Sequence, residues 1–250
     1  MVEPLFKKAF TAAPVVGQTI TLDGDEGKHA ASVRRLRVGE AVVLCDGLGT
    51  KAHGSVAALA SKSIDVLVER VEVVTEPALR VRLIQALAKG DRDELAIQAA
   101  TELGAYAVTP WQAERSISRW DAVKAAKGQE RWQVICDEAG KQALRAWFAK
   151  VEALTTSEQL VSAIAAGSLG QVLVLDPTAK VGLSSALSVQ NLAAEVSIVV
   201  GPEGGISETE LVEFEKAGAT RVHLGNDILR TSTAGVAAIA VINSSLGVYR

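Results

Sequence analysis

The chain has 250 residues and a formal net charge of −3 at pH 7; 48% of its residues are hydrophobic and 22% are charged. This is the composition of a globular protein with a sizeable core, built as one large or two smaller domains. Two distant cysteines without a CxxC pair argue against a disulfide framework or a zinc site and fit a reducing compartment. The first ten residues lack a secretory signal pattern, and the longest apolar run, residues 234–242, is well short of the ~20 residues of a membrane span. We therefore expect a soluble, cytoplasmic protein.

Residues 1–75 predict a small β-barrel-like domain. Strand-like stretches cover residues 42–44, 51–60 and 64–74, and a turn at residues 46–49 joins the first two as a hairpin. One helix, over residues 26–36, interrupts the strands. The character of the sequence changes near Thr75-Glu76-Pro77, where we place the domain boundary.

Residues 76–250 alternate between strand-like and helical stretches. The predicted strands cover residues 81–87, 106–110, 172–176, 196–200 and 221–224. The predicted helices cover residues 91–103, 121–148, 157–166, 207–217 and 231–246. This alternation predicts an α/β domain whose parallel sheet is covered by helices on both faces. Ligands of such sheets bind beyond the carboxyl ends of the strands, so the loops at residues 176–178, 201–206 and 224–230 are the expected site.

The loop at residues 201–206 has the sequence GPEGGI. Ser207 followed by Glu210 forms a capping box, which starts the next helix at about Glu208. A glycine-rich turn between strand and helix usually binds phosphate through backbone N–H groups, but Glu203 at the tip would repel phosphate. The alternative is a tight turn whose glutamate is solvated. The chain contains no P-loop, no dinucleotide fingerprint, no GxSxG and no histidine pair at metal-ligand spacing.

Basic residues are concentrated in the middle of the chain. Residues 80–150 hold twelve Lys and Arg against nine Asp and Glu, whereas residues 151–250 hold five against ten and residues 1–75 nine against nine. This leaves room for a local surface that binds an anionic ligand. Arg34, Arg35 and Arg37 cluster at the end of the first predicted helix. They are suited to phosphate contact, although arginines at a helix C-terminus are favoured electrostatically in any case.

A second group of arginines lies beside tryptophans. Arg115 and Arg119 stand near Trp111 and Trp120, a mixture of guanidinium and aromatic groups suited to unstacked RNA bases. The alternative is that the aromatic residues pack in the core near a strand end.

The stretch RWQVICDEAGKQALR has a polar face if it is helical. Arg131, Glu138, Gln142 and Arg145 then share one side with Ile135. That face is either a polar rim for a polynucleotide or partner subunit, or a solvated helix surface. The last predicted helix, residues 231–246, is apolar nearly all round and must be buried against its own sheet or a second subunit. Arg230 directly precedes it; the simplest alternative is a surface arginine in a loop.

These residues belong to a set of motifs that extends nearly from end to end of the chain. In order they are His29-x3-Val33-x-Arg35-Leu36 with Gly39, Lys89-Gly90-Asp91-Arg92-x-Glu94, Thr101-Glu102-Leu103-Gly104, Pro110 with Glu114-Arg115-Ser116, Arg131…Glu138-Ala139-x-x-Gln142-x-x-Arg145, Gly201-Pro202-Glu203-Gly204-Gly205 and Leu224-Gly225…Ile228-Leu229-Arg230-Thr231. With them the chain resembles the RsmE family, the bacterial 16S ribosomal RNA uridine-N3 methyltransferases of the SPOUT class.

The resemblance implies a PUA-like RNA-binding β-barrel over residues 1–75 and a SPOUT methyltransferase domain with a trefoil knot over residues 76–250. It implies a homodimer that methylates uracil N3 in 16S ribosomal RNA, acting on the small ribosomal subunit with S-adenosylmethionine as cofactor. Because the sequence has no Cys/His cluster, we expect no metal. The cofactor residues expected in the three loops are Leu175, Gly201, Gly205, Leu224, Gly225 and Leu229. A carboxylate there is compatible with a sulfonium cation.

The expected catalytic residues are Glu203 and Arg230. Glu203 would position the uracil or receive its N3 proton, and Arg230 would stabilise the oxyanion character that develops on the ring. The arginines expected to bind RNA are Arg34, Arg35, Arg115, Arg131 and Arg145.

The chain departs from the family's common pattern at three positions. Asp227 stands where an arginine is common, Ser232 where a glutamate is common and Ala149 where a proline is usual. Family roles of the first two side chains are therefore not carried over. Two other functions stay open: a related methyltransferase acting on another RNA position, such as a ribose hydroxyl, and a non-catalytic ribosome-assembly factor. The presence of Glu203 and Arg230 favours an active enzyme.

Overall fold

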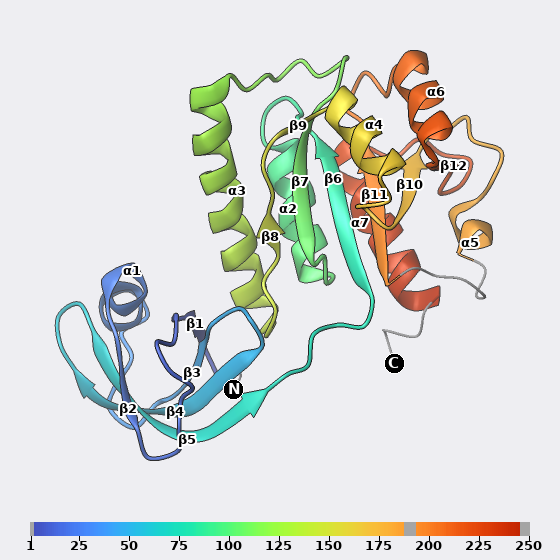
Figure 1. Ribbon diagram of the computed structural model, residues 1–250. Coiled ribbons are helices and arrows are strands. Elements are labelled where there is room, and N and C mark those ends of the chain that lie inside the picture. The colour runs from blue at the N-terminus through green and yellow to red at the C-terminus, as the bar shows by residue number, and fades with distance from the viewer. Residues whose placement is uncertain (1–2, 188–193, 246–250) are drawn as a thin grey trace. The chain divides into compact units, whose positions relative to one another are not determined.

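The computed structural model describes residues 3–187 and 194–245 (Figure 1). The chain divides into two units. The N-terminal unit consists of Met1–Glu76 together with Gly140–Phe148, and the second unit consists of Pro77–Ala139 and Ala149–Arg250.

The N-terminal unit is a curled five-stranded sheet in the order β1-β3-β4-β5-β2. Its strands are β1 (Leu5–Lys7), β2 (Thr19–Leu22), β3 (Ala41–Cys45), β4 (Thr50–Leu59) and β5 (Ile64–Val73). The three predicted strands are confirmed to within a residue at each end. β1 and β2 were not predicted, because they are only three and four residues long and become strands by pairing with β3 and β5. The interior of this sheet is filled mainly by Phe6, Leu22, Val42, Leu44, Ile64 and Val66.

The predicted helix of this unit is a short α-helix that continues as a π-helix: α1 (Gly24–Lys28) followed by η1 (His29–Val33). It ends three residues before the predicted end at residue 36. Arg35 then adopts a left-handed backbone with φ of 55°, and the Leu36 N–H donates to the Ala30 carbonyl at 3.1 Å. This is a helix-ending conformation that costs an arginine roughly 1–2 kcal/mol relative to glycine.

The predicted helix over residues 121–148 is wrong in its last six residues, because α3 (Ala122–Gln142) ends earlier. Leu144 has φ of 52°, and the segment that follows packs within the N-terminal unit. There the Trp147 Nε1–H donates to the Val74 carbonyl at 3.0 Å, and Phe148 packs against Leu5. Partial burial of these aromatic rings and the hydrogen bond to Val74 replace continuation of the helix. Arg145 therefore does not lie on one helical face with Arg131.

The second unit is built on a parallel sheet in the order β12-β10-β11-β6-β7-β8, with β9 pairing with β7. Its strands are β6 (Arg80–Ala86), β7 (Ala107–Gln112), β8 (Lys150–Val151), β9 (Thr155–Thr156), β10 (Gln171–Leu175), β11 (Glu195–Val200) and β12 (Thr220–Val222). Its helices are α2 (Arg92–Glu102), α3, α4 (Ser157–Ala165), α5 (Leu183–Ala186), α6 (Glu208–Ala217) and α7 (Thr231–Ser245). All five predicted strands and five predicted helices occur; β8, β9 and α5, each of two to four residues, were not predicted.

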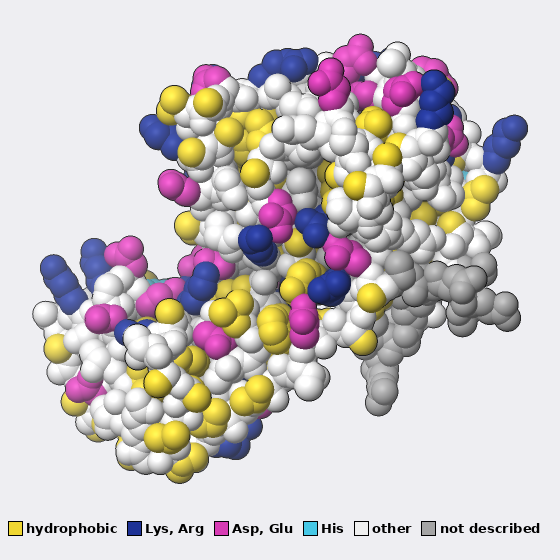
Figure 2. All heavy atoms as spheres, in the orientation of Figure 1, with side chains coloured by type: hydrophobic (Ala, Val, Ile, Leu, Met, Phe, Trp, Pro, Cys, Tyr) yellow, Lys and Arg dark blue, Asp and Glu magenta, His cyan; other side chains and the backbone are white. Residues whose placement is uncertain are grey.

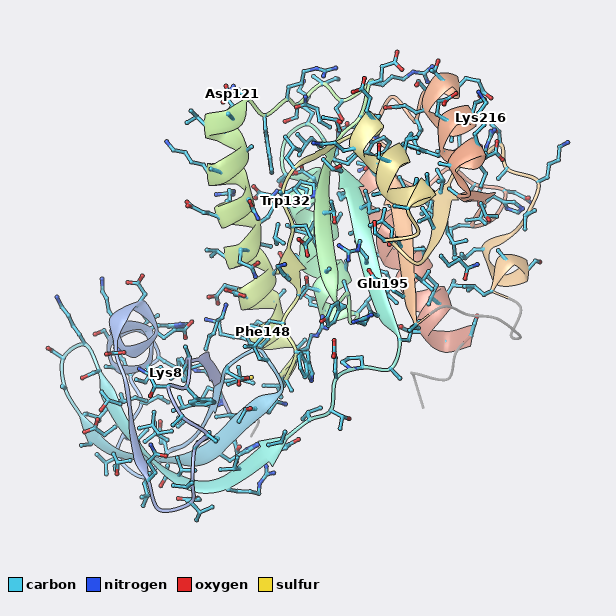
Figure 3. The ribbon with its side chains drawn as sticks, in the orientation of Figure 1. Lys8, Asp121, Trp132, Phe148, Glu195 and Lys216 are labelled. Atoms are coloured by element: carbon cyan, nitrogen blue, oxygen red, sulfur yellow. The ribbon has the colours of Figure 1, made fainter. Side chains whose placement is uncertain are left out.

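Helices cover both faces of this sheet, as predicted (Figure 1). On one face α4 and α6 contribute Leu160 and Phe214 to a core with Val174 and Val199. On the other face α2, α3, α5 and α7 pack against the alternate side chains of the same strands. Figure 3 shows Trp132 extending from α3 toward the sheet, where it is almost wholly buried.

The apolar helix α7 follows the edge strand β12 but packs against β11 and β6 in the middle of the sheet and against α2. Ala238, Ile239 and Ile242 are fully buried in this position, whereas Val236 and Ala240 stay half-exposed. The burial expected of a helix without a polar face is thus confirmed against its own sheet, and the return from the edge to the centre is the path expected of a knotted domain. Within residues 3–187 and 194–245, no helix is both long and apolar enough to cross a membrane.

Candidate functional site

A pocket lies where β10, β11 and β12 end at the carboxyl edge of the sheet. Its cavity volume is about 540 Å³, and residues from all three predicted loops line it. The lining includes every residue that we expected to hold a cofactor, namely Leu175, Gly201, Gly205, Leu224, Gly225 and Leu229. Glu203 and Arg230 line the same cavity. The predicted convergence of the three loops is therefore confirmed, while the binding roles of these residues stay predictions.

The loop of residues 201–206, which we call the fastened loop, is shaped by its own sequence. The Gly205 N–H donates to the Pro202 carbonyl at 2.9 Å, and Gly205 has φ of 72°, which only glycine adopts without strain. A Cβ on Gly201 would lie 2.6 Å from Ile206, so that position has no room for a side chain. The capping box is confirmed: the Ser207 hydroxyl accepts from the Glu210 N–H at 3.2 Å, and the Glu210 carboxylate accepts from the Ser207 N–H at 3.0 Å.

Glu203, at the tip of the fastened loop, is held from outside the loop. Its Oε1 accepts a hydrogen bond from Arg92 Nη1 at 2.7 Å and another from the Lys89 N–H at 3.0 Å. Partial burial disfavours the charged form, but the backbone hydrogen bond within Glu203 and the bonds from Arg92 and Lys89 outweigh it, so the pKa of Glu203 is lowered. Glu203 is exposed, as the alternative of a solvated glutamate expects, but its carboxylate is ion-paired and not free in solvent.

The same loop is held on its other side by Arg115. Its Nη1 donates to the carbonyl of Gly204 at 3.2 Å and, more weakly, to that of Ile206 at 3.5 Å. Buried Glu210 ties the helix that follows to its surroundings, since its Oε1 accepts from the Glu114 N–H at 2.7 Å and from the Ser157 hydroxyl at 2.6 Å. Sequence reasoning found the capping box but not these partners, which are distant along the chain.

The loop after β10 is organised by a buried ion pair. Asp176 Oδ2 accepts from Arg221 Nε at 2.8 Å, and Oδ1 accepts from both the N–H and the hydroxyl of Thr178 at 3.0 Å. Burial alone would raise the pKa of Asp176, but the hydrogen bonds from Thr178 and Arg221 lower it. The pair was not predicted; its one local signal was an aspartate two residues before a threonine at a strand end.

The third loop, residues 224–230, differs from the other two, and we call it the free loop. Within the described part of the chain no side-chain hydrogen bond or ion pair holds it. Ile228 is 80% exposed, and the exposed Arg230 guanidinium is directed to no protein partner among those residues. Leu224 at its start packs against the core, and at its end the Thr231 hydroxyl donates to the Gly201 carbonyl at 2.7 Å and accepts from buried Gln85 at 2.9 Å.

The five arginines predicted to bind RNA lie in different parts of the fold. Arg34 and Arg35 are exposed after η1, and Arg145 is half-buried in the Gly140–Phe148 segment, all in the N-terminal unit. In the second unit Arg115 is exposed while binding the fastened loop, and Arg131 on α3 forms a two-point ion pair with Glu94 on α2.

The tryptophans near Arg115 are packing residues. Trp111 is fully buried, and its Nε1–H donates to the Ser157 hydroxyl at 3.2 Å. Trp120 meets Trp132 edge to face, with ring centroids 5.3 Å apart. The suggestion that these rings stack on RNA bases is therefore wrong for Trp111, and the packing alternative holds.

Comparisons with known proteins agree with this architecture. The family described as "RNA methyltransferase domain" matches residues 75–243, and that described as "RNA methyltransferase PUA domain" matches residues 22–69. The chain is 40% identical over 233 residues to ribosomal RNA small subunit methyltransferase E of Mycobacterium bovis, covering 92% of this chain and 87% of that protein.

Two solved structures are similar over nearly the whole chain. Ribosomal RNA small subunit methyltransferase E from Neisseria gonorrhoeae, bound to S-adenosylmethionine, has a TM-score of 0.84 at 29% identity and covers 97% of this chain and 98% of that one. A methyltransferase from Legionella pneumophila in complex with the same cofactor has a TM-score of 0.86 at 27% identity and covers 98% of both chains. The predicted fold, a PUA-like barrel before a SPOUT-type α/β methyltransferase domain, is confirmed.

Proposed function

This chain belongs to the ribosomal RNA small subunit methyltransferase E family, and from that premise we propose that it methylates uracil N3 in 16S ribosomal RNA with S-adenosylmethionine as methyl donor. The observation that carries the proposal is the pocket at the carboxyl edge of the sheet, where Glu203 is held in place and Arg230 is exposed. An ordered carboxylate and an available guanidinium at one cavity suit a cationic cofactor and a base that becomes anionic.

The residues of the pocket suit this cofactor. A volume of about 540 Å³ lies within the usual range for small-ligand sites, and Leu175, Val200 and Leu224 supply apolar walls for the adenosine. A Cβ built on Gly205 or Gly225 would meet no atom within 4 Å, so the backbone there is open to a ligand. When bound, S-adenosylmethionine supplies an electrophilic methyl group on a sulfonium sulfur.

The chain's own residues then act on the uracil. N3 must lose its proton before it can accept a methyl group, and negative charge spreads to the neighbouring carbonyl oxygens. The exposed Arg230 guanidinium can donate hydrogen bonds to one of these oxygens and stabilise that charge. Glu203, whose pKa is lowered, is ionised and a weak base at neutral pH, so we assign it to positioning rather than to accepting the N3 proton.

The expected RNA partner is 16S ribosomal RNA in the small ribosomal subunit. Figure 2 shows acidic side chains gathered over α6, a surface unsuited to phosphate. We therefore place RNA contacts at Arg34, Arg35, Arg115, Arg131 and Arg145. We also expect a homodimer, since the half-exposed Val236 and Ala240 leave an apolar strip on α7. A monomer at micromolar concentration in sedimentation equilibrium would contradict the dimer.

The test is mass spectrometry of ribosomal RNA nucleosides. Small subunits from a strain lacking this gene are incubated with the purified protein and S-adenosylmethionine, and the RNA is digested to nucleosides. We expect 3-methyluridine to be absent before incubation and present after it. A ribose-methylated nucleoside in its place would support the alternative RNA methyltransferase. Binding to the subunits without any methylation would support the assembly factor.

A further inference from the structure

Arg92, the first residue of α2, lines the pocket and binds Glu203, but the function proposed above gives it no contact with the substrate. Its side chain is 46% exposed. Nη1 donates to Glu203, while Nε and Nη2 have no hydrogen-bond partner in residues 3–187 and 194–245. A guanidinium carries five N–H donors in one plane, so most of this group's donors are available to a ligand.

The orientation of Arg92 is set by its surroundings. Glu203 Oε1 accepts from the Lys89 N–H as well as from Arg92, which places the carboxylate at a defined point beside α2. Buried Asp93 fixes the turn before the helix, since its Oδ2 accepts from the Ala88 N–H at 3.0 Å. The hydrogen-bonded turn before α2 and the ion pair with Glu203 thus hold Arg92 at the cavity. Arg92 and Arg230 line the same cavity from different elements.

Two arginines match the chemistry of uracil better than one. N3 lies between two carbonyl oxygens, O2 and O4, and loss of its proton spreads negative charge over N3 and both oxygens. Because a guanidinium only donates hydrogen bonds, one arginine at each oxygen stabilises the anion. Cytosine carries an amino group in place of O4. Because this group and an arginine both donate hydrogen bonds, they cannot pair.

Resting on the proposed function, we infer that Arg92 is a second catalytic arginine, which binds one of the two oxygens that flank N3 while Arg230 binds the other. Glu203 is then a positioning residue that acts through Arg92. The pair of guanidinium groups also selects uracil over cytosine. N3 loses its proton to water, and the bound cofactor would supply the methyl group to N3 and leave as S-adenosylhomocysteine. Arg92 exchanges no atom.

The test uses the full-length protein and small ribosomal subunits under single-turnover conditions, with saturating substrates, from neutral to mildly alkaline pH. We expect Arg92→Gln to lower the methylation rate by about 10²-fold at neutral pH, the usual effect of removing one oxyanion donor. The deficit should shrink as the pH rises, because alkaline solvent removes the N3 proton that the missing cation no longer helps to remove. The dissociation constant of S-adenosylmethionine, measured by calorimetry, should rise by no more than the roughly tenfold expected for the loss of one bond to the fastened loop, and the rates are compared at saturating cofactor.

The second measurement is the energetic coupling between Arg92 and Glu203. Glu203→Gln should slow methylation less than Arg92→Gln, and the double variant should be no slower than Arg92→Gln alone. Arg92→Lys, which keeps the charge but loses the planar fork, serves as the milder change and should fall between wild type and Arg92→Gln. The matched controls are Glu213→Gln and Lys216→Gln, an exposed ion pair on α6, and both should leave the rate unchanged.

Each contrary result has a distinct meaning. A wild-type rate in Arg92→Gln, a deficit equal at every pH, or a deficit explained by weaker cofactor binding would overturn the role of Arg92. Additive losses in the double variant would overturn the positioning role of Glu203. A wild-type protein that makes no 3-methyluridine would refute the proposed function itself, whereas the outcomes above are read only against an active wild type.

Discussion

The fastened loop (residues 201–206) and the free loop (residues 224–230) line the same pocket but are held in different ways. The fastened loop is held by Arg92 through Glu203, by the Lys89 N–H and by Arg115 at two carbonyls. The free loop has no such side-chain bond among the described residues, and it exposes Ile228 and Arg230. The pocket thus combines a preorganised wall with a wall whose polar groups remain available to a ligand.

The energetic consequence follows from chain entropy. Ordering a loop costs roughly 1–2 kcal/mol per residue, and a hydrogen bond contributes about 1 kcal/mol in return. The bonds to the fastened loop offset part of that cost before any ligand binds. The free loop has no equivalent side-chain bonds among the described residues, so we expect its variants to affect turnover more than variants of the fastening residues.

The largest effect is expected for Arg230→Ala in the free loop. Its guanidinium has no protein partner in the described part of the chain, so removal should affect the substrate rather than the fold. We expect the methylation rate at saturating substrate to fall by about 10²–10³-fold, with little change in cofactor affinity. The control is Lys180→Ala, an exposed cation on the neighbouring loop outside the pocket lining. Wild-type turnover in Arg230→Ala would show that the free loop has no catalytic role.

A smaller effect is expected for Arg115→Ala, which releases one side of the fastened loop. Losing the bond to the Gly204 carbonyl should weaken S-adenosylmethionine binding by about tenfold, equivalent to roughly 1.4 kcal/mol. Calorimetry measures this directly. Arg119→Ala is the matched control, because that guanidinium donates to the Glu114 carbonyl, outside the loop. RNA affinity should also fall, because Arg115 is a proposed RNA contact, and it is measured separately. An unchanged cofactor affinity would show that the bond from Arg115 to Gly204 does not support cofactor binding.

The smallest effect on turnover is expected for Arg34→Ala with Arg35→Ala in the N-terminal unit. At saturating RNA the rate should be unchanged, but RNA affinity should fall for all sequences, since phosphate contacts position a protein without reading bases. The slope of log affinity against log salt should become shallower by about one unit for each phosphate that the variant no longer binds. The competing explanation is that these arginines only complete the end of η1. It predicts a lower melting temperature with RNA affinity and salt slope unchanged.

Much of the fold and of the pocket could be predicted from local sequence. The apolar run ending at Val200, the Gly-Pro turn and the Ser207–Glu210 capping box each depend on neighbouring residues alone, and each occurs as expected. Parallel sheets bind ligands at the carboxyl ends of their strands, and this rule predicted that the three loops converge at one site. The family motifs added the knotted SPOUT domain, which no periodicity predicts.

Only the tertiary structure determines which distant residues contact one another. Arg92 and Glu203 are 111 residues apart in the sequence, and they form an ion pair because β6 and β11 are neighbours in the sheet. The hydrophobic periodicity of either strand does not predict the order of strands in the sheet. Helix α3 ends at Gln142, although the pattern continues, because the partly buried rings of Trp147 and Phe148 pack in the N-terminal unit. Local sequence sets backbone conformation and helix caps through contacts within a few residues. Long-range burial and ion pairing depend on which elements the completed sheet makes adjacent.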